Sequence, residues 1–202
     1  MPGVAALLLA AGESSRMGEP KALLPWLGGR ALLAWGVESL REAGYSPIVV
    51  VLGHAAERLR AEVPSHPGVS IVVNDGHAGG RSTSIVAGVR AVPADADAVL
   101  VASIDQPRSV TLLRDLRVAW EASRPLIAVP ALDGRPGHPP LFSAVLRDEL
   151  LNVSEASEGL RAVVSRHRAE RLLVPSDDPL ALANLNTRAD YEAALRLASG
   201  GV

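Results

Sequence analysis

The sequence of 202 residues contains no cysteine. This absence excludes disulfide scaffolds, cysteine nucleophiles, iron–sulfur clusters and thiolate zinc sites. Long apolar runs are lacking too, because the longest uninterrupted one, residues 4–11, is far shorter than the about 20 residues of a membrane-spanning helix. Since the first basic residue is Arg16, no positive segment precedes that run as in a secretory signal. We therefore expect a soluble, cytoplasmic protein.

The chain also has little net charge, because 20 basic residues face 22 acidic ones. Such a balance creates no field that attracts nucleic acid or an anionic membrane, and we expect neither as a partner. Lysine is almost absent: 19 of the 20 basic residues are arginine, and Lys21 is the exception. An ammonium is a compact point charge, unlike a planar guanidinium. Composition alone leaves a specific role for Lys21 and chance retention equally open.

What is present is an alternation of short apolar runs with helical periodicity. The runs predict buried strands, and apolar residues spaced by three or four predict helices. We predict strands at residues 4–9, 48–52, 69–73, 98–104, 126–129 and 171–174. We predict helices at residues 31–43, 55–63, 82–92, 112–122, 144–151, 159–168 and 188–198. This order favours a single α/β domain over residues 1–202, with a mostly parallel sheet between two helical layers.

Ligands in such sheets bind beyond the carboxyl ends of the strands, so the loops after residues 9, 73 and 104 should face one cleft. In the first loop, small residues let the backbone approach a ligand closely, and its N–H groups can surround phosphate oxygens. Arg16 and Lys21 add positive charge that suits a triphosphate. The spacing matches neither a Walker loop nor a dinucleotide fingerprint, and an ordinary turn with incidental charges remains an alternative.

A carboxylate marks the end of the fourth strand. Asp105 follows this strand directly and stands before Gln106 and Pro107. A carboxylate in that place can hold Mg²⁺ against phosphates, because Mg²⁺ in proteins takes one or two carboxylates together with phosphate oxygens. By itself, an aspartate that begins a turn or caps the next helix is the commoner case.

Residues 9–21 resemble the signature L-A-[AG]-G-x-S-x-R-M-G-x-x-K of the MobA-like nucleotidyltransferases, with every fixed position present. The resemblance implies a Rossmann-like nucleotidyltransferase fold of the nucleotide-diphospho-sugar transferase type. It implies that a nucleotide contacts Leu9, Ala10, Ala11 and Gly12. It also implies three catalytic residues, namely Arg16 and Lys21 on the phosphates and Asp105, in a D-x-P motif, on the metal.

Two further segments resemble this family. Asn74, Gly80 and Ser84 match the spacing of a segment that the family uses near the base and ribose, and Ser82 could cap the helix there. Gly137-His138-Pro139 is typical of the MocA-like, cytidylyl-transferring branch, where it lines the acceptor side. A structural histidine in a turn is the alternative interpretation of His138.

The chain departs from the family pattern at Asn184, where MocA-like proteins usually have an aspartate that helps to bind the metal. An amide oxygen can still ligate Mg²⁺, so we keep Asn184 beside Asp105 as a predicted metal ligand. Ser157 also departs, since relatives tend to have aspartate there. Both departures favour an alternative, a non-catalytic nucleotide-binding accessory protein of a molybdenum hydroxylase.

The resemblance implies transfer of CMP from CTP to the phosphate of molybdopterin, with Mg²⁺ as cofactor and release of pyrophosphate. Ala11 favours cytidine over guanosine, because the guanylyl branch usually has glycine there. Residues 1–110 would mainly bind the nucleotide and residues 111–202 mainly the acceptor. A molybdenum hydroxylase or its chaperone is the implied protein partner. A sugar-phosphate nucleotidyltransferase remains an alternative that does not explain residues 137–139, and a glycosyltransferase is less well supported.

Overall fold

The computed structural model describes residues 3–13 and 18–200, so Arg16 lies outside the described residues. An eight-stranded sheet forms the centre, in the order β3-β2-β1-β4-β7-β5-β6, with β8 paired to β5. The strands are β1 (Val4–Ala10), β2 (Ile48–Leu52), β3 (Val69–Val73), β4 (Ala98–Ser103), β5 (Ile127–Leu132), β6 (Arg135–Pro136), β7 (Leu141–Ser143) and β8 (Arg171–Pro175). Strands β1 to β4 pair in parallel, as do β5 and β8, which confirms the mostly parallel α/β fold.

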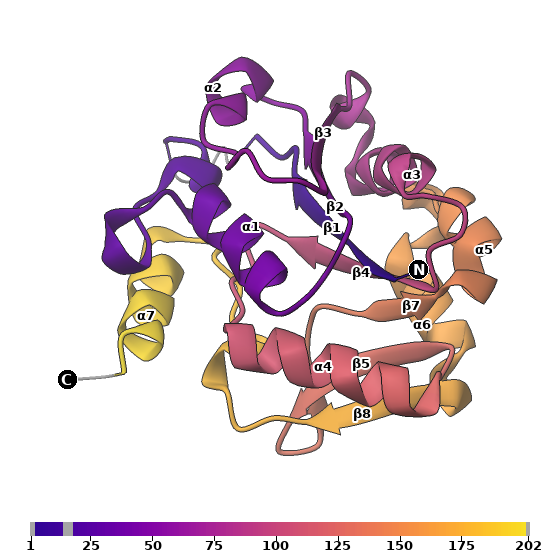
Figure 1. Ribbon diagram of the computed structural model, residues 1–202. Helices are drawn as coiled ribbons and strands as arrows, with labels where there is room; N and C mark the ends of the chain where they lie inside the picture. The colour runs from indigo at the N-terminus through magenta and orange to yellow at the C-terminus, as the bar shows by residue number, and fades with distance from the viewer. Residues whose placement is uncertain (1–2, 14–17, 201–202) are drawn as a thin grey trace.

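Helices cover both faces of the sheet (Figure 1). They are α1 (Leu32–Glu42), α2 (Ala56–Arg60), α3 (Arg81–Ala91), α4 (Val110–Ser123), α5 (Arg147–Leu151), α6 (Leu160–Arg166) and α7 (Arg188–Ala198). Each predicted helix is present, although α2 and α6 are shorter than predicted and residues 144–146 form a 3-10 turn before α5. None of the helices in the described ranges is both long enough and apolar enough to cross a membrane.

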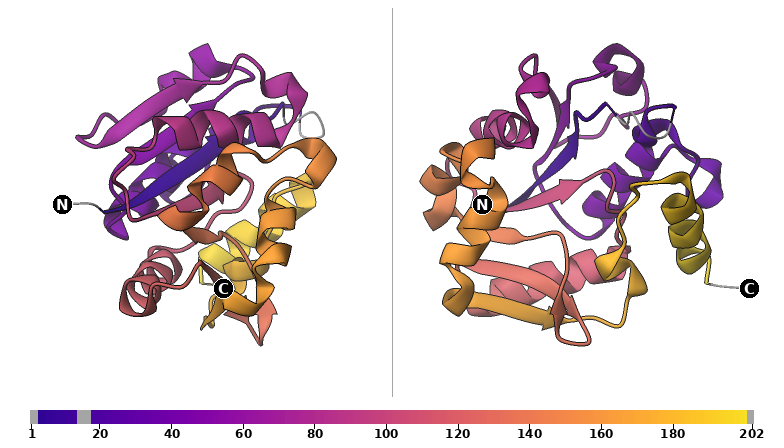
Figure 2. Two further views of the ribbon diagram at one scale, coloured as in Figure 1. Left: turned by 90° about the vertical axis from the view of Figure 1, so that its right-hand side faces the viewer. Right: turned by 180° about the vertical axis from the view of Figure 1, so that it is seen from behind.

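All seven residues of strand β1 are apolar and buried. Side chains alternate between the faces of a strand, and both faces of this one are covered. Val4, Ala6 and Leu8 belong to a core shared with α1 and α4, whereas Leu7 and Leu9 belong to a second core shared with α3, α5 and α6. The left view of Figure 2 shows α4 and the orange helices α5 and α6 on opposite sides of the strands.

Two short strands were missing from the prediction. Strand β7 lies antiparallel between β4 and β5, and the two-residue β6 forms a hairpin with β5. The hairpin turns at residues 133–134, and the chain then runs through β6 into β7. Residues 137–139 lie between them. The antiparallel insertion therefore places the Gly-His-Pro segment at the same sheet edge as the end of β4.

Helix α7 closes the chain against the segment before α1. A third apolar cluster joins them, and Trp26, Trp35 and Tyr191 pack in it with ring centroids 5.8 and 5.9 Å from that of Trp26. The helix begins at a capping box, in which Thr187 and Asp190 exchange side-chain and backbone hydrogen bonds. This packing fixes residues 183–187, which lie just before α7, next to the end of β4.

Candidate active site

A pocket of about 300 Å³ opens at the carboxyl ends of β1 and β4. It is lined by Leu9, Ala11, Gly12, Lys21, His77, Gly80, Arg81, Ser84, Ser103, Ile104 and Asp105. The loops after β1, β3 and β4 thus face one cavity, as their positions in the sequence predict. Of the described residues predicted to bind nucleotide, Leu9, Ala11, Gly12, Gly80 and Ser84 line this cavity. Ala10 points into the core instead and is 2% exposed.

Asp105 lies where β4 ends and the chain turns away from the sheet. The backbone holds it on both sides: the N–H of Ile104 donates to the carbonyl of Leu9 over 3.0 Å, and the carbonyl of Asp105 accepts from Leu185 N over 2.7 Å. Its carboxylate Oδ1 is buried and has no hydrogen-bond partner among the residues that the structure describes. A buried acceptor without a donor is costly, so this oxygen is available to an incoming cation or donor.

Asn184 lies beside Asp105 but is not directed freely into the pocket. Its Oδ1 accepts a hydrogen bond of 2.6 Å from Gln106 Nε2. The next residue, Leu185, makes the backbone contact to Asp105 described above. An amide oxygen has two lone pairs, so one remains available in this arrangement. The structure therefore places the segments that carry the two predicted metal ligands side by side, with Gln106 hydrogen-bonded to Asn184, although Asn184 itself is exposed and is not among the residues that line the pocket.

The loop after β3 is organised by Asn74. The buried side-chain amide of Asn74 donates to Thr83 Oγ1 over 2.8 Å and to Ser84 Oγ over 2.9 Å, and its Oδ1 accepts from Gly76 N over 3.0 Å. Because these bonds occupy the amide, Asn74 shapes the loop and is not among the residues that line the first pocket. Its partner Ser84 does line it.

The expected capping role of Ser82 is wrong. Helix α3 begins at Arg81, and its N-cap residue is Gly80, which has no side chain to cap it. The cap comes from a distant residue: Glu155 Oε1 accepts from the backbone N–H of Ser82 over 2.7 Å. Hydrogen bonding from Ser82 lowers the pKa of Glu155, and the positive charge of nearby Arg81 lowers it further. A carboxylate of the chain thus neutralises the N-terminus of α3.

A second pocket, of about 490 Å³, adjoins the first. Its lining includes Arg81, Gln106, Gly137, His138, Glu155, Glu158, Arg161 and Arg171. Arg81 lines both pockets, and Gln106, the neighbour of Asp105, reaches the second. Three arginines face two glutamates here, so the pocket carries a slight excess of positive charge. Of the predicted acceptor residues, Gly137 and His138 line it, whereas Pro139 is not among its lining residues.

His138 is held in its neutral form. Desolvation inside the pocket is the main cause, and the positive charges of Arg108 and Arg81 add to it, so that the pKa of His138 falls to about 4. A neutral imidazole offers one donor and one acceptor and no charge. At neutral pH the side chain can therefore hydrogen-bond an acceptor molecule, and the positive charge of the pocket comes from its arginines.

Arg108 holds the loops around both pockets together. It is 3% exposed, and its guanidinium donates to the carbonyls of His138 (2.7 Å), Pro107 (2.8 Å) and Ala183 (3.0 Å). Burial lowers the pKa of Arg108 to about 10, against the opposing influence of nearby Asp178 and Asp105, so it stays charged at neutral pH. One side chain thus fixes the Gly-His-Pro segment and the approach to Asn184 relative to the end of β4.

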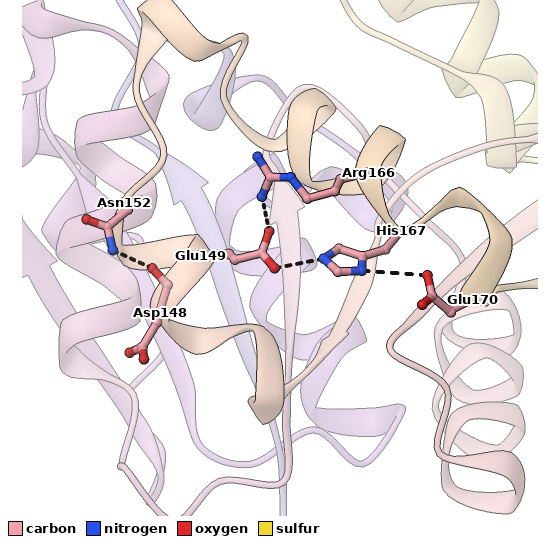
Figure 3. A network of polar contacts seen from close by, with 6 residues as sticks. All are labelled: Asp148, Glu149, Asn152, Arg166, His167 and Glu170. Carbon is pink, nitrogen blue, oxygen red and sulfur yellow. Dashed lines mark hydrogen bonds and ion pairs between the residues drawn. The ribbon is translucent and has the colours of Figure 1, made fainter.

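A polar network joins α5 to the end of α6 and the segment after it (Figure 3). Glu149 accepts a hydrogen bond from Arg166 and makes a contact of 2.7 Å with His167 Nε2, whose Nδ1 faces Glu170 at 3.6 Å. Burial acts to raise the pKa of Glu149, but the bonds and charges of His167 and Arg166 hold it below its usual value. The network fixes α6, which carries Arg161 to the pocket.

Several residues of the site carry no role in the sequence-based prediction. Arg81 lies within the segment from Asn74 to Ser84 and is the first residue of α3. Positive charge is unfavourable at a helix N-terminus, so this basic residue was a usable signal of a functional role. For Arg108 and Glu155 no local pattern exists, because each acts on segments 30 to 75 residues away. Lys21 lines the first pocket as predicted, and its charge contributes to the lowered pKa of Asp190.

Comparison with known sequences identifies the family. The MobA-like NTP transferase domain matches residues 6–172. The chain is 36% identical over 168 residues to nicotine blue oxidoreductase from Paenarthrobacter nicotinovorans. This match covers 80% of this chain and 81% of that protein. It is 31% identical over 163 residues to molybdenum cofactor cytidylyltransferase from Escherichia coli, covering 77% of this chain and 81% of that one.

Solved structures agree with this. A nucleotidyl transferase from Methanothermobacter superposes with a TM-score of 0.81 at 26% identity, covering 98% of this chain and 99% of the other. The Rv0371c protein from Mycobacterium tuberculosis superposes with a TM-score of 0.79 at 28% identity, covering 96% and 98%. That protein has also been solved as a complex with manganese, which at 24% identity supports the likeness in fold.

Proposed function

The chain belongs to the MobA-like NTP transferase family, and we propose that it transfers CMP from CTP to the phosphate of a molybdopterin-type acceptor. The observation that supports this most is the pair of adjoining pockets with Arg81 in both and Asp105 at the end of β4 beside them. One pocket would hold the nucleotide, mainly with residues 1–110. The other would hold the acceptor, mainly with residues 111–202.

In the proposed reaction an acceptor phosphate oxygen attacks the α-phosphorus of CTP. A new phosphorus–oxygen bond forms, the bond between the α-phosphorus and its bridging oxygen breaks, and pyrophosphate leaves. A phosphate nucleophile is already ionised near pH 7, so no general base is needed. This agrees with a neutral His138, whose role is then to hydrogen-bond the acceptor.

Cationic side chains stabilise the charge that moves onto pyrophosphate. Lys21 lines the first pocket, and we propose that it binds the phosphates together with Arg16, the family's matching arginine. Arg81, placed between the two pockets, is suited to contact the transferred phosphoryl group. Preorganised positive groups of this kind favour the transition state, because they meet a charge that is larger there than in the substrate.

The residues present fit a divalent cation of the Mg²⁺ type at Asp105. The carboxylate oxygen Oδ1 of Asp105 is buried without a donor among the described residues, and the amide oxygen of Asn184 lies on the adjacent loop. Mg²⁺ binds such oxygen donors while retaining phosphate and water ligands. When bound, the cation neutralises phosphate charge and polarises the phosphorus. Gln106 fixes the orientation of the Asn184 amide and thereby its contribution.

The most specific parts of the proposal are the base of the nucleotide and the chemical class of the acceptor. Ala11 lines the first pocket at the position that favours cytidine, and the Gly-His-Pro segment lines the second. A sugar-phosphate nucleotidyltransferase would use the same Asp105 with UTP or another nucleotide. A nucleotide-binding accessory protein for a molybdenum hydroxylase or its chaperone would bind CTP without turnover. The alternatives therefore differ in which nucleotide binds and whether pyrophosphate is released.

The first test is thermal unfolding in the presence of CTP, GTP, ATP and UTP, each with and without Mg²⁺. A ligand at 100 times its dissociation constant stabilises by about 2.7 kcal/mol, which is roughly 5–10 °C for a domain of this size. We expect the largest shift with CTP and Mg²⁺, and a smaller one for the Asp105→Asn variant. Preference for UTP would redirect the proposal to sugar phosphates, and no shift with any nucleotide would refute nucleotide binding.

A further inference from the structure

Three side chains that can bind metals meet beside the first pocket, at the ends of β1, β2 and β3, whereas Asp105 follows β4 on the other side of β1. Glu13, His54 and His77 each offer one ligand atom, and these atoms all lie within 4.8 Å of one another. We propose that they bind a transition-metal ion of the Zn²⁺ type, at a second site that is separate from the proposed cation site at Asp105. The inference does not depend on the proposed transfer reaction.

The three ligands come from three consecutive strands of the parallel sheet. Glu13 follows β1, His54 follows β2 and His77 follows β3, so all three stand at the carboxyl edge of neighbouring strands. The loops are joined directly, because the backbone N–H of His54 donates to the carbonyl of Ala11 over 3.1 Å. The site is therefore assembled by the sheet and does not rest on one flexible segment.

Gly53 makes this convergence possible. A Cβ atom at residue 53 would lie 2.7 Å from His77 Cβ and 2.8 Å from Ala11 Cβ, distances that real side chains do not tolerate. Only glycine lets the loops after β1 and β3 close over the end of β2. The close approach brings Ala11, in the segment after β1, and the His77 side chain against Gly53, which directly precedes His54.

His77 is already oriented as a ligand. Its ring Nδ1 lies 3.1 Å from the backbone carbonyl of Asn74. A carbonyl only accepts, so Nδ1 carries a proton in this contact, and in the neutral ring Nε2 then has the lone pair that can bind a metal. Histidines that bind metals usually donate their other ring N–H to such a carbonyl or carboxylate, which fixes the ring and its tautomer. Asn74 is itself buried and held by Thr83 and Ser84, so this support is rigid.

The donor set selects the class of metal. Two imidazoles and one carboxylate suit Zn²⁺ and neighbouring transition metals, whereas Mg²⁺ and Ca²⁺ prefer oxygen ligands alone. Tetrahedral Zn²⁺ with bonds of about 2.0–2.1 Å needs ligand atoms roughly 3.4 Å apart. Glu13 and His54 are exposed, so small side-chain rotations can close the remaining distance. Three protein ligands leave a fourth position open.

The open position gives the site a consequence for ligands. His77 also lines the first pocket, and Glu13 directly follows Gly12 of the same lining. A bound metal would connect the start of the loop after β1 to the loops after β2 and β3. It would place a positive charge at the rim of the pocket, where water or a ligand can complete its coordination. We therefore expect a bound metal to alter the affinity of the first pocket for its ligand.

The test is a titration of the full chain with Co²⁺, which reports its coordination by visible absorption, followed by displacement with Zn²⁺. We expect one equivalent to bind to the wild-type protein with the absorption of a site that contains imidazole ligands. The variants His54→Ala and His77→Ala should weaken binding by at least about 10-fold, the lower end of losses seen when even a supporting partner of a metal site is removed. Glu13→Gln should weaken it in the same direction and change the spectrum.

Two control variants make the result specific. His66→Ala removes a histidine that contacts Glu38 elsewhere on the chain and should bind Co²⁺ like the wild type. Asp105→Asn should also retain this absorption, since its site is distinct. Circular dichroism verifies folding of each variant. The proposal is overturned if the wild type binds no Co²⁺ or Zn²⁺, if His54→Ala and His77→Ala bind as the wild type does, or if Asp105→Asn alone removes the signal.

Discussion

Replacing the buried Arg108 with methionine tests how the site is held together. The substitution keeps a long side chain in the same space but removes every hydrogen bond to the carbonyls of Pro107, His138 and Ala183. It also removes the positive charge near Asp105 and Asp178. Two opposing effects have to be weighed, because burying a guanidinium is itself costly and methionine avoids that cost.

The carbonyls that lose their donor decide whether Arg108→Met raises or lowers the stability of the fold. A buried acceptor that loses its donor destabilises the fold by about 1–3 kcal/mol. Taking the low end for each of the three carbonyls, since water can reach some of them, gives about 3 kcal/mol of lost stability. For a domain of 150–250 residues, each kcal/mol lowers the melting temperature by roughly 2–4 °C. The expected decrease is therefore roughly 6–12 °C by the same scaling. Arg108→Lys, which keeps the charge but not the planar geometry, should lose less.

Thermal unfolding followed by circular dichroism measures this effect. Arg114→Met is the matched control, because Arg114 is exposed and makes one long hydrogen bond, of 3.3 Å, to Glu42. Surface substitutions of that kind usually change stability by less than about 0.5 kcal/mol. If Arg108→Met melts no lower than Arg114→Met, the buried guanidinium does not hold the loops together and this reasoning is refuted.

Three further predictions concern single residues. Gly137→Ala should lower both stability and acceptor binding, because a Cβ atom at residue 137 would lie 2.3 Å from the carbonyl oxygen of Ala181. A melting temperature equal to that of the wild type would contradict this close approach. Desolvation and the charges of Arg108 and Arg81 lower the pKa of His138 to about 4, from the ordinary value of 6.5, so the unfolded state binds more protons between these values. Stability should therefore fall as pH falls from 6.5 to 4, and this slope, measured by thermal unfolding, should flatten in His138→Gln. Lys21→Arg should reduce pyrophosphate release although the charge is kept, and a fully active variant would mean that the single lysine has no special role.

Much of the fold could be predicted from local patterns. The core strand β1 is a continuous apolar run because both of its faces are covered, and the start of α7 follows from its capping box. Strand β7 was missed because three residues after two prolines show no period. Its antiparallel pairing depends on β4 and β5, which are distant in the sequence.

The candidate site was predictable to the extent that strand ends define it. The segments at Gly12 and Asp105 lie at one edge of the sheet, because parallel strands bring their carboxyl ends together. His138 reaches the same edge through the antiparallel insertion of β7, which the sequence did not predict. The supporting contacts were not predictable. Glu155 caps a helix that begins more than 70 residues earlier, and Arg108 joins loops that meet only in the folded chain. Such contacts depend on tertiary packing and leave no local signature.

Acceptor-dependent release of pyrophosphate from CTP tests the central claim most directly. The assay compares the wild-type protein with Asp105→Asn, in the presence of molybdopterin and Mg²⁺, and identifies the product by mass. The account predicts release that requires both acceptor and cation, and loss of turnover in Asp105→Asn while CTP binding stays measurable. Turnover by Asp105→Asn at the wild-type rate, or binding of CTP by the wild type without any release, would contradict it.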